Sequence, residues 1–154
     1  MRRENKFRGK RVDNGEWVTG SMLTGFFFRG GEDIPYIMTS EGTDYDCFED
    51  IQEGNGIYEV IPETVGQYTG INDKNGKKIF EGDIVDNSYI NPLSNSEVIQ
   101  RYVIRWENGI YRMIFIDSVP KKYYDRMLFL EFNQVELIGN ICDNTELLQE
   151  VAEK

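Results

Sequence analysis

The sequence contains no histidine, and this absence restricts the chemistry that its side chains can perform. Without an imidazole, Ser-His-Asp and Cys-His nucleophile arrangements, His-ligated zinc and imidazole acid/base catalysis are all excluded. The two cysteines, Cys47 and Cys142, lie far apart and in no metal-ligand spacing. We expect both to be free thiols in a reducing compartment, packed as small apolar side chains.

The chain is rich in carboxylates, with 27 Asp and Glu residues. Four of them, Asp44, Asp46, Glu49 and Asp50, lie close enough in sequence to form a weak divalent-cation site or an acid/base pair. Such a site requires several oxygens that converge from a fixed backbone, and spacing alone does not show convergence. We interpret residues 40–56 as a solvated acidic loop, and we expect no metal, no cofactor and no enzymatic activity.

Basic side chains concentrate at the N-terminus of an otherwise acidic chain. The net charge is −10, whereas residues 1–12 carry six Lys or Arg and one Glu, a local charge of 6 − 1 = +5. The remaining 142 residues therefore carry −15. A second basic group lies on a predicted hairpin at residues 98–116. The candidate interaction residues are Arg2, Arg3, Lys6, Phe7, Arg8, Arg101, Arg105 and Arg112.

Two hypotheses use these residues. In the first, the chain is a protein-interaction module that self-associates, and the basic arm of one subunit docks on the acidic body of another. In the second, the arm and the 98–116 hairpin bind nucleic acid by stacking and phosphate contacts, although the net charge disfavours this. A variant is an acidic decoy that mimics DNA. A structural alternative places Phe7 in a first strand that packs on the core, with the basic residues at its rim.

Turns give the clearest local signal. Asn-Gly occurs at residues 14–15, 55–56, 75–76 and 108–109, and both residues tolerate the positive φ that tight hairpins require. Alternating apolar and polar residues on either side of 108–109 predict a hairpin over 98–116. Gly82-Asp83 predicts a turn before a strand. Residues 86–97 are rich in Asn and Ser and predict an exposed loop, and residues 143–151 predict a short terminal helix.

No apolar run approaches the roughly 20 residues that a membrane helix needs. The N-terminus also lacks the apolar stretch of a secretory signal. We therefore expect a cytoplasmic protein with no membrane partner.

Several segments together resemble the YopX-like proteins of bacteriophages and prophages. They are the Lys-Phe-Arg at residues 6–8, ETVGQYTG at 63–70, DKNGKKIFEGDIV at 73–85, and VELIGNI at 135–141. In the closing motif, Cys142, Asp143 and Thr145 replace the tyrosine, glutamate and proline that the family usually has. The resemblance implies a mostly-β fold with an SH3-like barrel near the C-terminal half and a phage-encoded cytoplasmic protein. It implies no activity and no functional residues.

Together these patterns predict a mostly-β protein. We expect an N-terminal β subdomain with an acidic loop at residues 1–62. At 63–154 we expect an SH3-like barrel subdomain that packs with it and ends in a short helix. For function, we expect a non-enzymatic interaction or assembly module that forms homo-oligomers or binds a host or phage protein.

Overall fold

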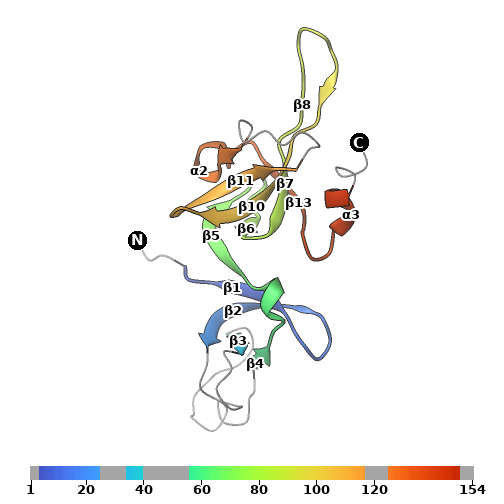
Figure 1. The fold of residues 1–154 in the computed structure, drawn as a ribbon. Coiled ribbons are helices and arrows are strands. Elements are labelled where there is room, and N and C mark those ends of the chain that lie inside the picture. Colours follow the sequence, from blue (N-terminus) through green and yellow to red (C-terminus); the bar gives the residue numbers. More distant parts are fainter. Residues whose placement is uncertain (1–3, 25–33, 40–55, 117–124, 150–154) are drawn as a thin grey trace. The chain divides into compact units, whose positions relative to one another are not determined.

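The computed structural model describes residues 4–24, 34–39, 56–116 and 125–149, and statements below refer to these residues. The chain is mostly β, with antiparallel sheets and a short C-terminal helix, as predicted (Figure 1). It divides into two compact units, Met1–Tyr68 and Thr69–Lys154. We predicted a boundary after residue 62, a few residues earlier.

The first unit is built on an antiparallel sheet in the order β4-β3-β2-β1, with the start of β5 beside β1. Its elements are β1 (Phe7–Lys10), β2 (Trp17–Thr24), β3 (Pro35–Met38), β4 (Ile57–Glu59), η1 (Pro62–Thr64) and β5 (Gly66–Asn72). β1 is therefore an interior strand, paired with β2 on one side and with β5 on the other. Ile37 and Val60 are fully buried and form the centre of this small core.

The second unit contains a five-stranded antiparallel sheet in the order β12-β11-β10-β7-β13. After the end of β5, its elements are β6 (Lys78–Phe80), β7 (Asp83–Asp86), β8 (Tyr89–Ile90), β9 (Glu97–Val98), β10 (Arg101–Glu107), β11 (Ile110–Phe115), β12 (Arg126–Met127), α2 (Leu128–Glu131), β13 (Glu136–Asn140) and α3 (Thr145–Gln149). β12 and β13 are its edges, and no pairing among the described residues closes it. The SH3-like barrel is therefore not confirmed.

One face of this sheet covers the larger core. Alternation along β10 places Tyr102 and Ile104 on the inner face, where both are fully buried. The core cluster consists of Ile79, Val85, Tyr102, Ile104, Met113, Leu128 and Val135. Trp106 continues the inner face, but it lies at the end of the hairpin, where half of its surface is exposed.

The β10–β11 hairpin confirms the predicted turn type, but its strands are shorter than the predicted 98–116, because Val98 belongs to β9. The strands pair from Tyr102 with Phe115 to Glu107 with Ile110. Asn108 and Gly109 both have positive φ, at 51° and 82°, as a type I′ turn requires. At residues 14–15 and 75–76 only the glycine has positive φ, so those Asn-Gly pairs form other turns.

Residues 86–97 are largely exposed, as predicted, but they are not a simple loop, because they contain β8 and Glu97 of β9, which pair with each other. The short terminal helix is confirmed as α3. The acidic residues 40–55 lie outside the described part of the chain. No helix in the described ranges is long and apolar enough to cross a membrane.

Candidate interaction surface

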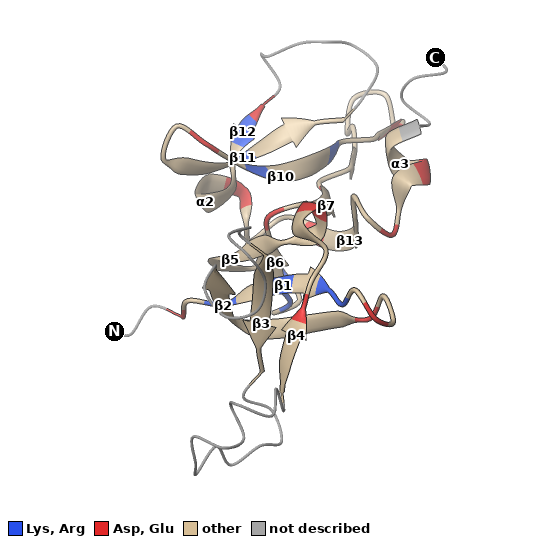
Figure 2. Ribbon diagram, turned by 60° about the horizontal axis from the view of Figure 1, so that its bottom comes forward, with Lys and Arg blue, Asp and Glu red and all other residues tan. Residues whose placement is uncertain are grey.

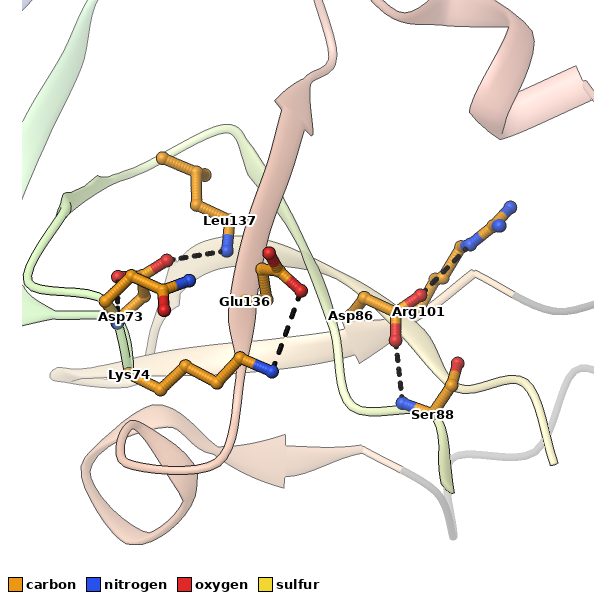
Figure 3. Close-up of polar contacts among 8 residues, drawn as sticks. Asp73, Lys74, Asp86, Ser88, Arg101, Glu136 and Leu137 are labelled. Carbon is orange, nitrogen blue, oxygen red and sulfur yellow. Dashed lines mark hydrogen bonds and ion pairs between the residues drawn. The ribbon is translucent and has the colours of Figure 1, made fainter. Parts of the chain in front are cut away.

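Asp73, in the segment that most resembles the YopX-like proteins, has a structural role. Its Oδ1 accepts the backbone N–H groups of Asn75 at 2.8 Å and Lys77 at 2.9 Å. Its Oδ2 accepts that of Leu137 at 2.9 Å (Figure 3). The carboxylate thus ties the turn after β5 to β13, far away in sequence. Burial opposes ionisation, but the three donors outweigh it and lower the pKa of Asp73.

Two other residues of these segments also stabilise the fold. Asp83 is buried, and its Oδ2 accepts the backbone N–H of Phe80 at 2.7 Å, which closes the Gly-Asp turn. Gly139 leaves room for Asn144, whose Oδ1 accepts the N–H of Asn140 at 3.1 Å. A Cβ at position 139 would overlap that oxygen. The carboxylates of Asp73 and Asp83 thus both accept backbone N–H groups.

Asp86 fixes the base of the hairpin formed by β8 and β9. One of its oxygens accepts the N–H of Ser88 at 2.7 Å, and the other pairs with Arg101 Nε at 3.4 Å (Figure 3). Asn87 N–H donates to the Gln100 carbonyl at 2.8 Å, and Gln100 N–H donates to Ser88 Oγ at 3.0 Å. Entry and exit of the segment are thus held together, so we call residues 87–100 the clamped hairpin.

The clamped hairpin carries exposed apolar side chains away from the sheet of its unit (Figure 1). The exposed fraction is 96% for Leu93, 58% for Ile90, 49% for Tyr89 and 46% for Ile99. Its only charged residue is Glu97, in a chain where 29% of residues are charged. Sequence reasoning missed this surface because Asn, Ser and Pro dominate the segment. The sequence feature that could have revealed this surface is a set of apolar residues with almost no charged residues among them.

A second exposed apolar group lies on and beside α2. Met127, Phe129, Leu130 and Phe132 are each more than two fifths exposed, while Leu128 alone of this segment is fully buried. The helix has a single turn and one inward position, so its other side chains cannot reach the core. Residues 117–124, which precede β12, lie outside the described residues, and nothing in the described ranges identifies what contacts this group.

Strand alternation places the three predicted arginines of the 98–116 hairpin on the face opposite Tyr102 and Ile104. Figure 2 colours the Lys and Arg positions of the ribbon blue, including those on β10. Arg105 and Arg112 are directly opposite each other across β10 and β11. Arg101 pairs with Asp86, and Arg112 pairs with Glu107 and Asp125, each at 3.6 Å. Carboxylates thus offset two of the three positive charges that phosphate binding would use.

The predicted N-terminal arm is a strand from Phe7 to Lys10, and Arg2 and Arg3 lie outside the described residues. Phe7 and Arg8 are half-buried within the sheet, which supports the structural alternative for Phe7. Lys6 forms an exposed ion pair with Glu4 at 3.7 Å, beside a pocket of about 240 Å³. The other lining residues of that pocket are Asn5, Gly20, Ser21, Met38 and Thr39.

A basic and aromatic cluster does form on this strand. The Arg8 guanidinium lies 4.8 Å from the Trp17 ring centroid, and Lys10 Nζ lies 5.4 Å from it. On the other face, Arg11 stacks on Tyr58 at 4.0 Å and donates to Asp13 at 2.8 Å. These cation–π contacts hold the cations against the sheet and account for part of the N-terminal basic run.

Clusters of metal-ligating side chains are absent from the described ranges. No three Asp, Glu or Cys side chains gather there as a metal site would require. Cys142 is a half-buried free thiol, and Cys47 lies outside the described residues.

Comparison with known proteins places the whole chain in one family. No curated protein matches the sequence. The crystal structure of protein EF1440 from Enterococcus faecalis is similar over 94% of this chain and 98% of its own, with 23% identity and a TM-score of 0.48. The family model described as YopX protein matches residues 6–149, nearly the full length. The chain therefore belongs to the YopX family.

Proposed function

We propose that this protein is a non-enzymatic interaction module and that the clamped hairpin is its contact surface for another protein. The observation that carries the proposal is the exposure of Tyr89, Ile90, Leu93 and Ile99 on a segment with a single charge. Exposed apolar groups of this kind, on a projecting element, are typical of protein contact sites. Burying one such side chain contributes about 1.5–3 kcal/mol.

The contacts at the base of the clamped hairpin favour an ordered segment. Asp86 holds both Ser88 and Arg101, so the hairpin is anchored in the sheet that carries the core. An anchored element loses less conformational freedom on binding than a free loop does. The geometry therefore supports a preorganised contact surface.

Finer parts of the hypothesis rest on the family and on the strand pattern. We propose a phage or prophage origin and a cytoplasmic location, which the family resemblance supports. We also propose that the five-stranded sheet of the second unit is an opened relative of an SH3-like barrel. Its antiparallel strands with one covered face support this.

Photo-crosslinking in the native cells tests the interaction proposal. A benzophenone amino acid at position 93 should give discrete protein adducts on irradiation, because Leu93 is almost fully exposed at the hairpin tip. Position 75 provides a matched control, since Asn75 is also an exposed turn residue but lies outside the hairpin. The absence of adducts at 93, or the same adducts from both positions, would refute the proposal.

Nucleic-acid binding is the second candidate, and the Arg8–Trp17–Lys10 cluster favours it. Aromatic and basic side chains on one sheet face can stack bases and contact phosphates. Mobility shifts with single- and double-stranded targets should then weaken steeply with salt and be lost on Trp17→Ala. No shift at low salt would exclude this candidate.

A further inference from the structure

We propose that the partner bound at the clamped hairpin is a second copy of this chain, joined through the outer edge of β8. The inference rests on the proposed function, since it names the partner of the same surface. The two copies would form one four-stranded antiparallel sheet about a twofold axis.

The hydrogen-bond ladder identifies which backbone groups face outward. Tyr89 pairs with Val98, Asn87 N–H donates to Gln100, and Asn91 N–H donates to the Ser96 carbonyl at 2.9 Å. In an antiparallel ladder the residues between hydrogen-bonded pairs point their N–H and C=O away from the partner strand. Ile90 is such a residue, so its backbone faces the outer edge of β8.

The β8 edge is only two residues long, but it lacks three other features that protect natural sheet edges. Such edges usually carry charges, proline or bulges that prevent pairing with another chain. β8 has none of these within Tyr89–Ile90, and Pro92 follows only after the strand ends. β9 carries Glu97, and this charged side chain disfavours pairing at the opposite edge of the hairpin. Pairing through β8 is therefore favoured over pairing through β9.

A two-stranded hairpin is itself only marginally stable, and further strands stabilise it. A twofold axis at Ile90 would let each Ile90 exchange both backbone hydrogen bonds with Ile90 of the second copy. The two isoleucine side chains would then lie directly opposite each other, which is a favourable cross-strand pair. The outward N–H and C=O groups of β8 in each copy would thus find their hydrogen-bond partners in β8 of the second copy.

Charge determines how this pairing responds to salt. Each copy carries a net charge of −10, so two copies repel each other wherever their acidic surfaces approach. The clamped hairpin, with Glu97 as its only charge, is a segment where two copies can meet with little repulsion. Salt screens the remaining repulsion. Self-association through this edge should therefore strengthen with salt, whereas docking of a basic arm on an acidic body would weaken.

Disulfide trapping tests the geometry directly. In a Cys47→Ser/Cys142→Ser background, Ile90→Cys places two thiols across the proposed axis. Paired residues there have Cα atoms about 5.5 Å apart, within the range of roughly 4.4–6.8 Å that a disulfide spans. Leu93→Cys is the matched control: it is more exposed, but it lies in the turn beyond β8, three residues from the proposed axis in each copy, so its two thiols would not face each other.

The purified full-length variants are oxidised mildly at high salt and resolved without reductant. We expect a covalent dimer from Ile90→Cys to form at least tenfold faster than one from Leu93→Cys. Equal rates would indicate random collision, and a faster Leu93→Cys reaction or no dimer from either variant would also overturn the inference. If discrete heterologous adducts still form at position 93 in cells, the interaction module stands and only the second copy is excluded.

Discussion

Asp73→Asn is the substitution that most directly tests how the family segment stabilises the fold. Asparagine has nearly the same shape as aspartate but only one side-chain oxygen. That oxygen can still accept the N–H groups of Asn75 and Lys77. The amide nitrogen then faces the N–H of Leu137, where Oδ2 of Asp73 accepts at present. If the amide flips, its NH₂ group faces two N–H donors instead of one.

The expected loss follows from these three bonds. A hydrogen bond to a charged acceptor contributes about 1.5–3 kcal/mol, and a buried donor without an acceptor costs about 1–3 kcal/mol. Asp73 is only 5% exposed, so water can replace little of what is lost. One bond disappears and two lose their charge assistance. We expect Asp73→Asn to lower the free energy of unfolding of the second unit by about 2–4 kcal/mol.

Urea unfolding followed by tryptophan fluorescence measures this change in one unit at a time. Trp17 lies in the first unit and Trp106 in the second, so a Trp17→Phe background leaves Trp106 as the reporter. Glu136→Gln is the control, because Glu136 lies in the same unit and its exposed ion pair with Lys74 at 3.6 Å should contribute less than about 1 kcal/mol. A change below about 0.5 kcal/mol for Asp73→Asn would refute the assigned role.

The lowered pKa of Asp73 adds a pH dependence with a defined sign. A carboxyl whose pKa is lower in the folded state stabilises the fold above its unfolded pKa, and this contribution is lost as pH falls through the folded pKa. The stability difference between the native sequence and Asp73→Asn should therefore be full at pH 7 and shrink as pH falls below about 4. A difference that stays constant into acid would contradict this.

Three further outcomes follow from the same structure. Gly139→Ala should destabilise by about 1–3 kcal/mol through overlap with Asn144, and it should cost much less in an Asn144→Ala background, as a double-mutant cycle in urea will measure. Arg112→Gln should cost less than about 1 kcal/mol in the same assay, because its ion pairs are long and partly exposed. Ile90→Lys should leave the unfolding midpoint nearly unchanged but abolish self-association in light scattering, since the side chain is exposed at the β8 edge.

The sequence predicted those elements whose signals are local. Alternation and the Asn108-Gly109 pair determine the β10–β11 hairpin without help from distant residues. The Gly82-Asp83 turn and the short terminal helix were equally readable, because each depends on a few neighbouring residues. The family resemblance also came from contiguous segments, and the match over residues 6–149 confirms it.

Interactions between distant residues were not predictable. Nothing near Asp73 indicates that its second oxygen accepts from Leu137, because that contact exists only once β13 is in place. Similarly, the sequence left a docking arm and a first strand both open for the basic run near the N-terminus, and only the pairing of β1 with β2 and β5 places Phe7–Lys10 in a sheet. The clamped hairpin was hidden because its stability depends on Asp86 and Arg101 outside it.

The solution mass at low and high salt, measured by light scattering after gel filtration, tests the central claim most directly. One copy has a mass of 18.0 kDa, so a dimer has 2 × 18.0 = 36.0 kDa. We predict a mass near one copy at low salt that rises toward two copies at high salt and high protein concentration, and that stays near one copy for Ile90→Lys. A monomer at both salts, or an oligomer that dissociates as salt rises, would contradict association through the uncharged edge of β8.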